Sequence, residues 1–409
     1  MCGRSGINPS SKMCMLMTKV FNLTTLSRLT LHHHLKHLQS KSIISFSSKT
    51  PGSSSVSSPV EHVVLVSDST NIFINLALED WIFDHGDLRA KSYLLMWRNS
   101  PAVVIGRHQN PWMECNVSEA RRRKVEIVRR RSGGGTVYHD EGNVNFSFIM
   151  ARPRYNRKAN LELVVQAILS RWDVDLTLNK RDDIILNGAY KVSGTAAKLS
   201  GDKTYHHFTF LLDVNKENLS HLLQSKLVGV KSKATESVPA SVMNVREVTP
   251  QMTFEEVVGS VGHSFLQNNL NKESYIEHVD PTEEVFPGLE KNIENLQSWE
   301  WIFGNTPKFS IFRHFSNHSN GTVYNLKINM IINKGRIEQI TIDLYLGKEQ
   351  CRTMVTETDS ICAKLMGLRY ISEEVVSVLC QIEGMGEKTS FSEVNDVLIW
   401  ILTCIRQCF

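Results

Sequence analysis

A run of three glycines between arginines and a polar aromatic segment constrains this chain more than any other feature. Residues 129–135 read Arg-Arg-Arg-Ser-Gly-Gly-Gly, residues 136–140 read Thr-Val-Tyr-His-Asp, and the alternating strand 143–148 follows. Glycine has no Cβ, so a ligand can lie against the main chain and take hydrogen bonds from its N–H groups. A plain hairpin turn, which is the alternative, needs only one or two glycines. We therefore predict that this segment binds an anionic, partly apolar ligand.

The composition is that of a globular protein with room for two domains. The chain has 409 residues, of which 41% are hydrophobic and 22% charged. Its net charge of +4 is small for this length, so nothing in it demands nucleic acid or an anionic membrane as a partner. The most apolar stretch, residues 397–405, has about half of the roughly 20 residues that a bilayer crossing needs, and we expect no membrane span.

The first 61 residues have the composition of a mitochondrial transit peptide. No acidic residue precedes Glu61, while lysines and arginines are spread among Ser, Thr and Leu. Residues 47–58 are rich in serine and read as a linker. We predict that residues 1–61 are a transit peptide and Ser-rich linker and that the protein works in the mitochondrial matrix, with an unstructured polar tail as the alternative.

The eight cysteines form neither a CxxC pair nor a zinc-ligand spacing with histidine. We therefore expect neither a metal site nor a disulfide framework. Cys115, in a loop after Pro111 and Trp112, is a conceivable nucleophile, but no base is placed beside it by any readable spacing. We interpret it as a bystander.

The order of predicted elements indicates an α+β fold, with a mixed sheet covered by helices and no regular βαβ repeat. Asn187-Gly188, between two apolar runs, is a strong signal for a hairpin. The predicted strands are 63–66, 93–97, 102–105, 125–128, 143–148, 183–186, 190–192 and 205–212, and the predicted helices are 71–83, one that starts at 118–120, 161–172 and 254–266.

We place a domain boundary in the loop 281–288, which gives a catalytic domain of residues 62–285 and a small C-terminal α+β accessory domain of residues 286–409. In the second domain, antiparallel strands are expected at 309–315, 323–332 and 337–344, and a helix at 373–379. The apolar run 398–402, in the atypical tail 384–409, is either a packed final helix or an alternative chain end.

A second constellation follows the predicted hairpin, where residues 191–198 read Lys-Val-Ser-Gly-Thr-Ala-Ala-Lys. A lysine at the end of a strand, beside small residues that leave the backbone accessible, suits an anionic ligand. A solvated hairpin lysine is the alternative, and it is the commoner fate of lysines.

Together these segments resemble the lipoate–protein ligase A and lipoyltransferase family, which shares the biotin and lipoyl ligase fold, and within it the mitochondrial lipoyltransferases. The resemblance covers about residues 62–345. It is carried by five motifs, at residues 130–143, 191–196, 106–112, 205–209 and 299–309.

The resemblance implies that the chain binds lipoyl-AMP as a donor substrate, with no tightly bound cofactor and no metal. The loop Gly133, Gly134, Gly135 and Arg130 would line a lipoyl tunnel, whereas Tyr138, Arg181, Lys191 and Thr209 would face the nucleotide or phosphate. Lys191 would be the catalytic residue, a cation between acyl carbonyl and phosphate. The further substrate-binding residues implied are Ser132, His139, Asp183, Ser193, Gly194, Thr195, His207 and, in the segment that covers the adenylate, Thr235.

The implied reaction moves a lipoyl group to the acceptor lysine of lipoyl domains in the pyruvate, 2-oxoglutarate and branched-chain 2-oxoacid dehydrogenase complexes. The donor would be lipoyl-AMP or the lipoylated H protein of the glycine cleavage system. Members that make their own adenylate carry Arg-Asn-Asp where this chain has Arg181-Asp182-Asp183, and a further carboxylate would repel a triphosphate or recruit metal.

Two other functions stay open. An ATP-dependent lipoate–protein ligase would carry out both activation and transfer. An RNA-binding module would use residues 121–124 and 129–131 as a basic patch, but the aromatic stacking strand of such modules is missing, and we expect no nucleic acid partner.

Overall fold

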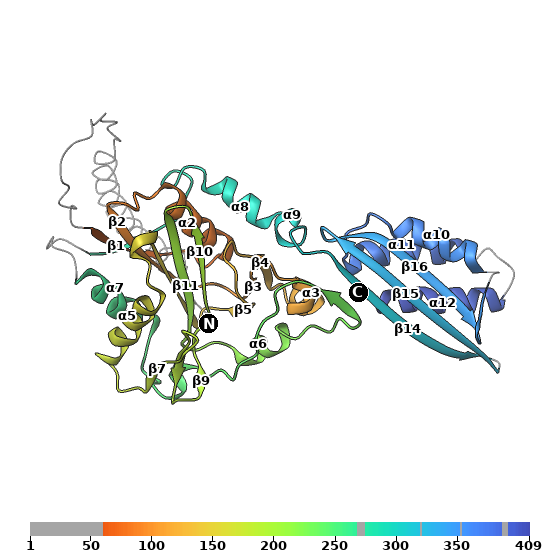
Figure 1. Cartoon of the computed structure of the whole chain (residues 1–409), viewed down its shortest axis with the longest axis horizontal. Helices are drawn as coiled ribbons and strands as arrows, with labels where there is room; N and C mark the ends of the chain where they lie inside the picture. Colours follow the sequence, from red (N-terminus) through yellow and green to blue (C-terminus); the bar gives the residue numbers. More distant parts are fainter. Residues whose placement is uncertain (1–59, 268–274, 320, 352–353, 387–391) are drawn as a thin grey trace, which may run out of the picture. The chain divides into compact units, whose positions relative to one another are not determined.

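The computed structural model describes residues 60–267, 275–319, 321–351, 354–386 and 392–409 (Figure 1). The predicted transit peptide lies outside these residues, apart from Val60 and Glu61, and stays a prediction.

A mixed six-stranded sheet forms the centre of the catalytic region, which confirms the predicted α+β class. Strand β1 pairs in parallel with both of its neighbours, and the other neighbouring pairs are antiparallel. In spatial order the strands are β10 (Thr195–Ser200), β11 (Lys203–Leu211), β6 (Asn143–Ala151), β2 (Lys91–Trp97), β1 (Glu61–Ser67) and β13 (Ile276–Val279).

Helices cover both faces of this sheet. Helix α2 (Ile72–His85), which the Asn71 side chain caps, packs on one face, and α5 (Arg157–Leu169) and α7 (Phe254–Leu266) pack together on the other (Figure 1). Polar and apolar residues alternate along β6, and Asn145 and Ser147 are buried like Phe146. The reason is that both faces of the sheet are covered. Asn145 donates to the Trp97 carbonyl, whereas the Ser147 hydroxyl has no hydrogen-bond partner among the described residues.

Two three-stranded sheets flank the central one and carry the two motifs. The first has the order β4 (Glu126–Arg129), β3 (Ala102–Ile105), β5 (Val137–His139). The second has the order β7 (Leu176–Leu178), β8 (Ile184–Leu186), β9 (Tyr190–Lys191). The predicted hairpin is confirmed, because Asn187 and Gly188 turn between β8 and β9 with φ values of +52° and +65°.

Short helices connect these strands: α3 (Pro111–Glu114), α4 (Val117–Arg122) and α6 (Lys216–Leu222), together with 3₁₀ turns at Arg152–Arg154 and Val245–Glu247. The helix expected at 161–172 begins earlier and ends earlier than predicted. Asn156 caps it by accepting from the Ala159 N–H, and the chain turns at Ser170.

The C-terminal residues, joined by strand β12 from the predicted catalytic domain, form a five-stranded antiparallel sheet with three helices, and the predicted long strands are confirmed. In order, the strands are β12 (Val230–Ser232), β14 (Phe309–Ser319), β15 (Thr322–Asn333), β16 (Arg336–Leu346) and β17 (Glu349–Gln350). The helices are α10 (Val355–Leu365), α11 (Ser372–Gly386) and α12 (Ser392–Arg406). The apolar run of the tail is therefore part of a packed final helix, with Ile401, Leu402 and Ile405 buried.

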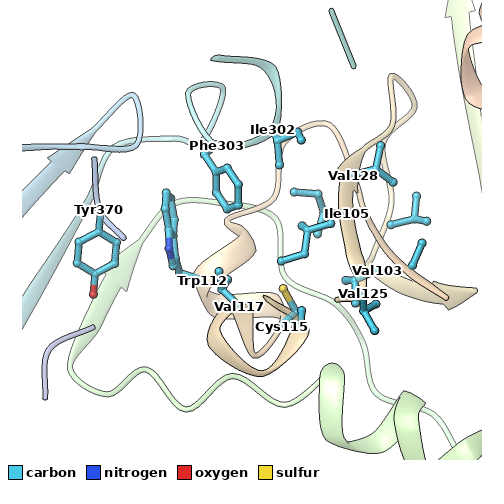
Figure 2. Close-up of a cluster of buried hydrophobic side chains, with 14 of the residues drawn as sticks. Val103, Ile105, Trp112, Cys115, Val117, Val125, Val128, Ile302, Phe303 and Tyr370 are labelled. Carbon is cyan, nitrogen blue, oxygen red and sulfur yellow. The ribbon is translucent and has the colours of Figure 1, made fainter. Parts of the chain in front are cut away.

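The segment that connects the central sheet to the C-terminal sheet packs against the catalytic region. Helix α8 (Leu289–Gln297) packs against α2, and the Trp81 indole donates to the Pro287 carbonyl. After α9 (Trp299–Ile302), the aromatic rings gather around Trp112, which Figure 2 shows between Phe303 and Tyr370. The domain boundary at residue 285 stays a prediction.

Candidate functional site

Arg130 shapes the glycine loop. Its guanidinium donates to the carbonyls of Gly133 at 2.6 Å and Gly135 at 2.7 Å, and also to the Val104 carbonyl. Between these two anchors Gly134 has φ +84°, a conformation that favours glycine. Burial lowers the pKa of Arg130 to about 10, well above neutral pH, so the loop surrounds a cation.

A buried chain of hydrogen bonds connects this cation to a carboxylate. Glu79, on α2, accepts from His207 Nδ1 at 2.8 Å, and His207 Nε2 lies 2.7 Å from the Ser132 hydroxyl, which also accepts from Arg130 Nε. Because a carboxylate only accepts, His207 Nδ1 carries a proton and donates it to Glu79. Although the order Glu-His-Ser is that of a nucleophilic triad, Ser132 is only 1% exposed and lies outside the cavity lining. This chain of hydrogen bonds therefore holds the glycine loop in its conformation.

Lys191 is paired with Asp183. Its Nζ lies 2.7 Å from the Asp183 carboxylate, which is itself buried. The backbone of Lys191 donates to the Ser241 carbonyl, and Ser193 accepts from the Ile184 N–H. The lysine is thus held by the hairpin, by the segment 241–242 and by an ion pair, and it is not the freely solvated lysine of the alternative interpretation.

Small polar residues lie next to Lys191 in the same motif and on the neighbouring strand β11. Thr209 accepts from the Gly194 N–H at 2.8 Å, and Thr195 lies 2.6 Å from His206 Nε2. Burial, followed by the charge of Arg157, lowers the pKa of His206 to about 3. The His206 ring is therefore neutral near physiological pH.

A segment from the C-terminal sheet covers the site. It leaves that sheet as β12, and the Thr235 N–H then donates to the His108 carbonyl. The Ser237 hydroxyl bonds to the carboxylate of Glu114 and accepts from the Thr136 N–H at 2.8 Å. No local pattern in the sequence pointed to Glu114 or Ser237, because their partners are distant along the chain.

These walls enclose one cavity of about 1050 Å³. Of the predicted site residues, only Ser132 and Gly133 lie outside its lining. The lining includes Arg130, Gly134, Gly135, Tyr138, His139, Arg181, Asp183, Lys191, Ser193, Gly194, Thr195, His207, Thr209 and Thr235. Their individual roles toward a ligand stay predictions.

The cavity has a buried and an exposed end. Leu76, Trp97 and Val104, each at most 4% exposed and all in the hydrophobic cluster on the α2 side of the sheet, form an apolar inner end that sequence reasoning missed. At the mouth Arg181 is exposed and Val238 is 64% exposed. The cavity can therefore bury an apolar chain and leave a polar, reactive group near Lys191.

Three other functional interpretations can be compared with the structure. Cys115 lies in the bend between α3 and α4, as predicted, and burial raises the pKa of its thiol to about 12, which opposes a nucleophilic role. Arg129 and Arg130 are buried and donate to carbonyls, so they cannot form a basic patch for RNA. Among the described residues, no cluster of His, Cys, Asp or Glu is arranged to hold a metal ion.

Comparisons with known proteins agree with this geometry. The family model of the lipoyl protein ligase A/B catalytic domain matches residues 71–266. The mitochondrial lipoyl amidotransferase LIPT1 of Mus musculus is 39% identical over 296 residues, 72% of this chain and 79% of the relative. The Homo sapiens protein of the same name is 42% identical over 283 residues, 69% of this chain and 76% of the relative.

More distant relatives share the fold. The lipoate–protein ligase A of Bdellovibrio bacteriovorus is 36% identical over 250 residues, 60% of this chain and 73% of that protein. The crystal structure of Plasmodium falciparum LipL1 with lipoate is 24% identical and has a TM-score of 0.54, and the match covers 84% of this chain and 99% of that one. This likeness supports the fold of the chain.

Proposed function

Because this chain belongs to the family of lipoyl amidotransferases and lipoate–protein ligases, we propose that it transfers a lipoyl group from an activated donor to the lysine of a lipoyl domain. It is an acyltransferase that forms an amide bond to a protein lysine. The observation that carries the proposal is the cavity, which joins an apolar inner end, Gly134 and Gly135 of the glycine loop and the Lys191–Asp183 pair.

The proposed donor is lipoyl-AMP, a mixed anhydride that needs no nucleophile from the enzyme. The acceptor amine attacks the acyl carbon, the bond from that carbon to the phosphate oxygen breaks, AMP leaves, and the amine proton passes to water. Negative charge develops on the carbonyl and phosphate oxygens, and the Lys191 ammonium can stabilise it. Asp183, 2.7 Å from Lys191 Nζ, holds that ammonium in place before the donor arrives.

Transfer from a preformed donor is favoured over ATP-dependent activation. Asp182, where self-activating members have asparagine, has φ +59° and lies 3.9 Å from Arg157 Nε. Asp182 does not line the cavity, but its carboxylate lies beside Arg157, which does, and it would add negative charge near a triphosphate bound at Arg181, at a cost in binding. The lipoylated H protein of the glycine cleavage system is the second proposed donor, and the ATP-dependent ligase remains the alternative function.

The proposed acceptors are the lipoyl domains of the pyruvate, 2-oxoglutarate and branched-chain 2-oxoacid dehydrogenase complexes. The relatives from mouse and human are named mitochondrial, which supports a mitochondrial protein, and we propose the matrix as its compartment. Among the residues that the structure describes, none of the helices combines the length and hydropathy that a membrane crossing requires.

The test is a mass assay of an apo lipoyl domain incubated with the purified protein. One reaction contains lipoyl-AMP, and the other contains lipoate, ATP and magnesium. Modification by the adenylate alone supports a transferase, whereas modification in both reactions would establish a complete ligase and refute the argument from Asp182.

The role of Lys191 is tested in the same assay. Lys191→Ala should lose about 10²–10³ in transfer rate while the protein stays folded. The matched control is Lys180→Ala, since Lys180 is exposed on the same segment and does not line the cavity. Near-normal transfer by Lys191→Ala would remove the lysine from the mechanism.

A further inference from the structure

A buried network behind the cavity fixes the chemistry of His139. The Asn75 amide nitrogen donates to the backbone carbonyls of Ser69 at 2.9 Å and Arg98 at 3.3 Å. The same nitrogen lies 2.9 Å from Asn99 Oδ1, and Asn99 Nδ2 lies 2.9 Å from His139 Nδ1. The whole chain of side chains is buried, from Asn75 to His139.

The backbone carbonyls decide which atoms donate. A carbonyl oxygen can only accept, so the Asn75 atom that faces Ser69 and Arg98 must be its NH₂ group. The Asn99 atom beside that NH₂ group must then be the oxygen, and the other end of Asn99 is its own NH₂ group. His139 Nδ1 accepts from this group and carries no proton. Burial, and then the charges of Arg130 and His207, lower the pKa of His139 to about 3, so the ring is neutral and its proton is on Nε2.

This Nε2–H group has no partner among the described residues. In this structure side chains enclose the Nε2 atom, so a ligand contacts it only after the inner end of the cavity has widened. The His139 residue itself lines the cavity, as do Arg130 and His207. A second buried donor at the same inner end, Trp97 Nε1, also lacks a partner. Unsatisfied buried donors are uncommon in folded proteins, and with Arg157 Nε three of them belong to residues that line this one cavity.

The depth of His139 in the cavity indicates which part of the substrate it would contact. His139 is 4% exposed, as is Leu76, whereas Val238 at the mouth is 64% exposed. The acceptor lysine must reach the acyl carbon from the mouth, near Lys191. The far end of the acyl chain therefore extends to the inner end. In a lipoyl group this far end is a dithiolane ring, whose two sulfurs are its only possible acceptors.

We propose that the Nε2–H of His139 donates a hydrogen bond to a dithiolane sulfur, so that the inner end of the cavity selects a sulfur-containing acyl group over a plain fatty acyl group of similar length. This inference rests on the proposed function, for which it names the feature that distinguishes the substrate. An octanoyl group would leave the donor unpaired in an apolar site.

Sulfur is a weak acceptor, and the discrimination is accordingly modest. A buried donor that loses its partner costs about 1–3 kcal/mol, of which a weak sulfur bond recovers part. We expect the full-length protein to favour lipoyl-AMP over octanoyl-AMP by about five- to tenfold in kcat/KM for transfer to a lipoyl domain.

The experiment measures this ratio in three variants. His139→Leu removes the donor, and the ratio should fall to about one to two. His139→Gln keeps an N–H group and should retain part of the preference. Val104→Ala, at the same inner end, changes packing alone and should lower transfer of both acyl groups alike.

A measurement without catalysis accompanies it. In ¹⁵N NMR of the histidine-labelled protein, with His139→Gln as the assignment control, His139 should show a bare Nδ1 and a protonated Nε2, and lipoate should shift the Nε2 signal more than octanoate does. A proton on Nδ1, an equal response to the two acids, or an unchanged ratio in His139→Leu would each overturn the inference. Loss of transfer from both adenylates would count against the proposed function, and the NMR result would still decide the inference.

Discussion

Removing the carboxylate of Glu79 should destabilise the protein by more than any surface charge can. Glu79 is 1% exposed and accepts from His207 Nδ1 at 2.8 Å. Arg130, at the other end of the chain through Ser132, is 5% exposed and has no carboxylate among its described ion-pair partners. Glu79 is thus the nearest counter-charge that hydrogen bonds connect to Arg130.

The magnitude follows from what each substitution leaves behind. Glu79→Gln keeps an oxygen for His207 but removes the charge, and we expect a loss of about 2–3 kcal/mol, the difference between charged and neutral hydrogen bonds plus part of the unbalanced Arg130. Glu79→Leu also leaves the His207 donor unpaired, and we expect about 3–5 kcal/mol.

The assay is urea unfolding followed by tryptophan fluorescence, with the free energy of unfolding extrapolated to water. The control is Glu61→Gln, because Glu61 has a 52% exposed side chain and pairs with Lys91 at the surface. This control should change stability by less than about 1 kcal/mol. A loss below 1 kcal/mol for Glu79→Leu would refute the idea that the buried chain balances Arg130.

Three further outcomes are expected. Trp112→Ala should lower the free energy of unfolding in urea by about 3–5 kcal/mol, because the Trp112 ring packs on Phe303, Phe309 and Tyr370. The control Ile399→Ala, at a 52% exposed position, should lower it by less than about 0.5 kcal/mol, and similar losses for both variants would contradict this. Burial lowers the pKa of His139 and His206 from 6.5 to about 3, so the unfolded chain binds more protons than the folded protein below pH 6.5. The free energy of unfolding should therefore fall by up to about 1.4 kcal/mol per pH unit for each histidine as the pH drops from 6.5 toward 3. A flat profile down to about pH 5 would show that these rings are not held neutral. Cys115→Ala should retain lipoyl transfer, and the Cys115 thiol, whose pKa burial raises to about 12, should resist iodoacetamide in the folded protein. Loss of transfer by a folded Cys115→Ala variant would make Cys115 a catalytic candidate again.

The sequence by itself determined the local elements and the two motifs. The Asn187-Gly188 hairpin, the capped helix α2 and the long strands near the C-terminus depend on periodicity and on residues close in the chain, so they were predictable. Residue types and spacing also pointed to Lys191 and the glycine loop as site candidates, and Lys191, Gly134 and Gly135 line one cavity, while their roles toward a ligand stay predictions. The resemblance, which the relatives bear out, then gave the family.

Only the tertiary structure decided which partners these residues have. Glu79 and His207 are 128 residues apart, and Ser237 and Glu114 are 123 apart, so no local pattern links them. The burial of both faces of β6, the use of Arg130 to shape its own loop and the proton position on His139 likewise depend on what packs from elsewhere. Whether a buried group finds a hydrogen-bond partner depends on which atoms lie next to it in three dimensions. The sequence shows which polar groups are present, but not which atoms they contact.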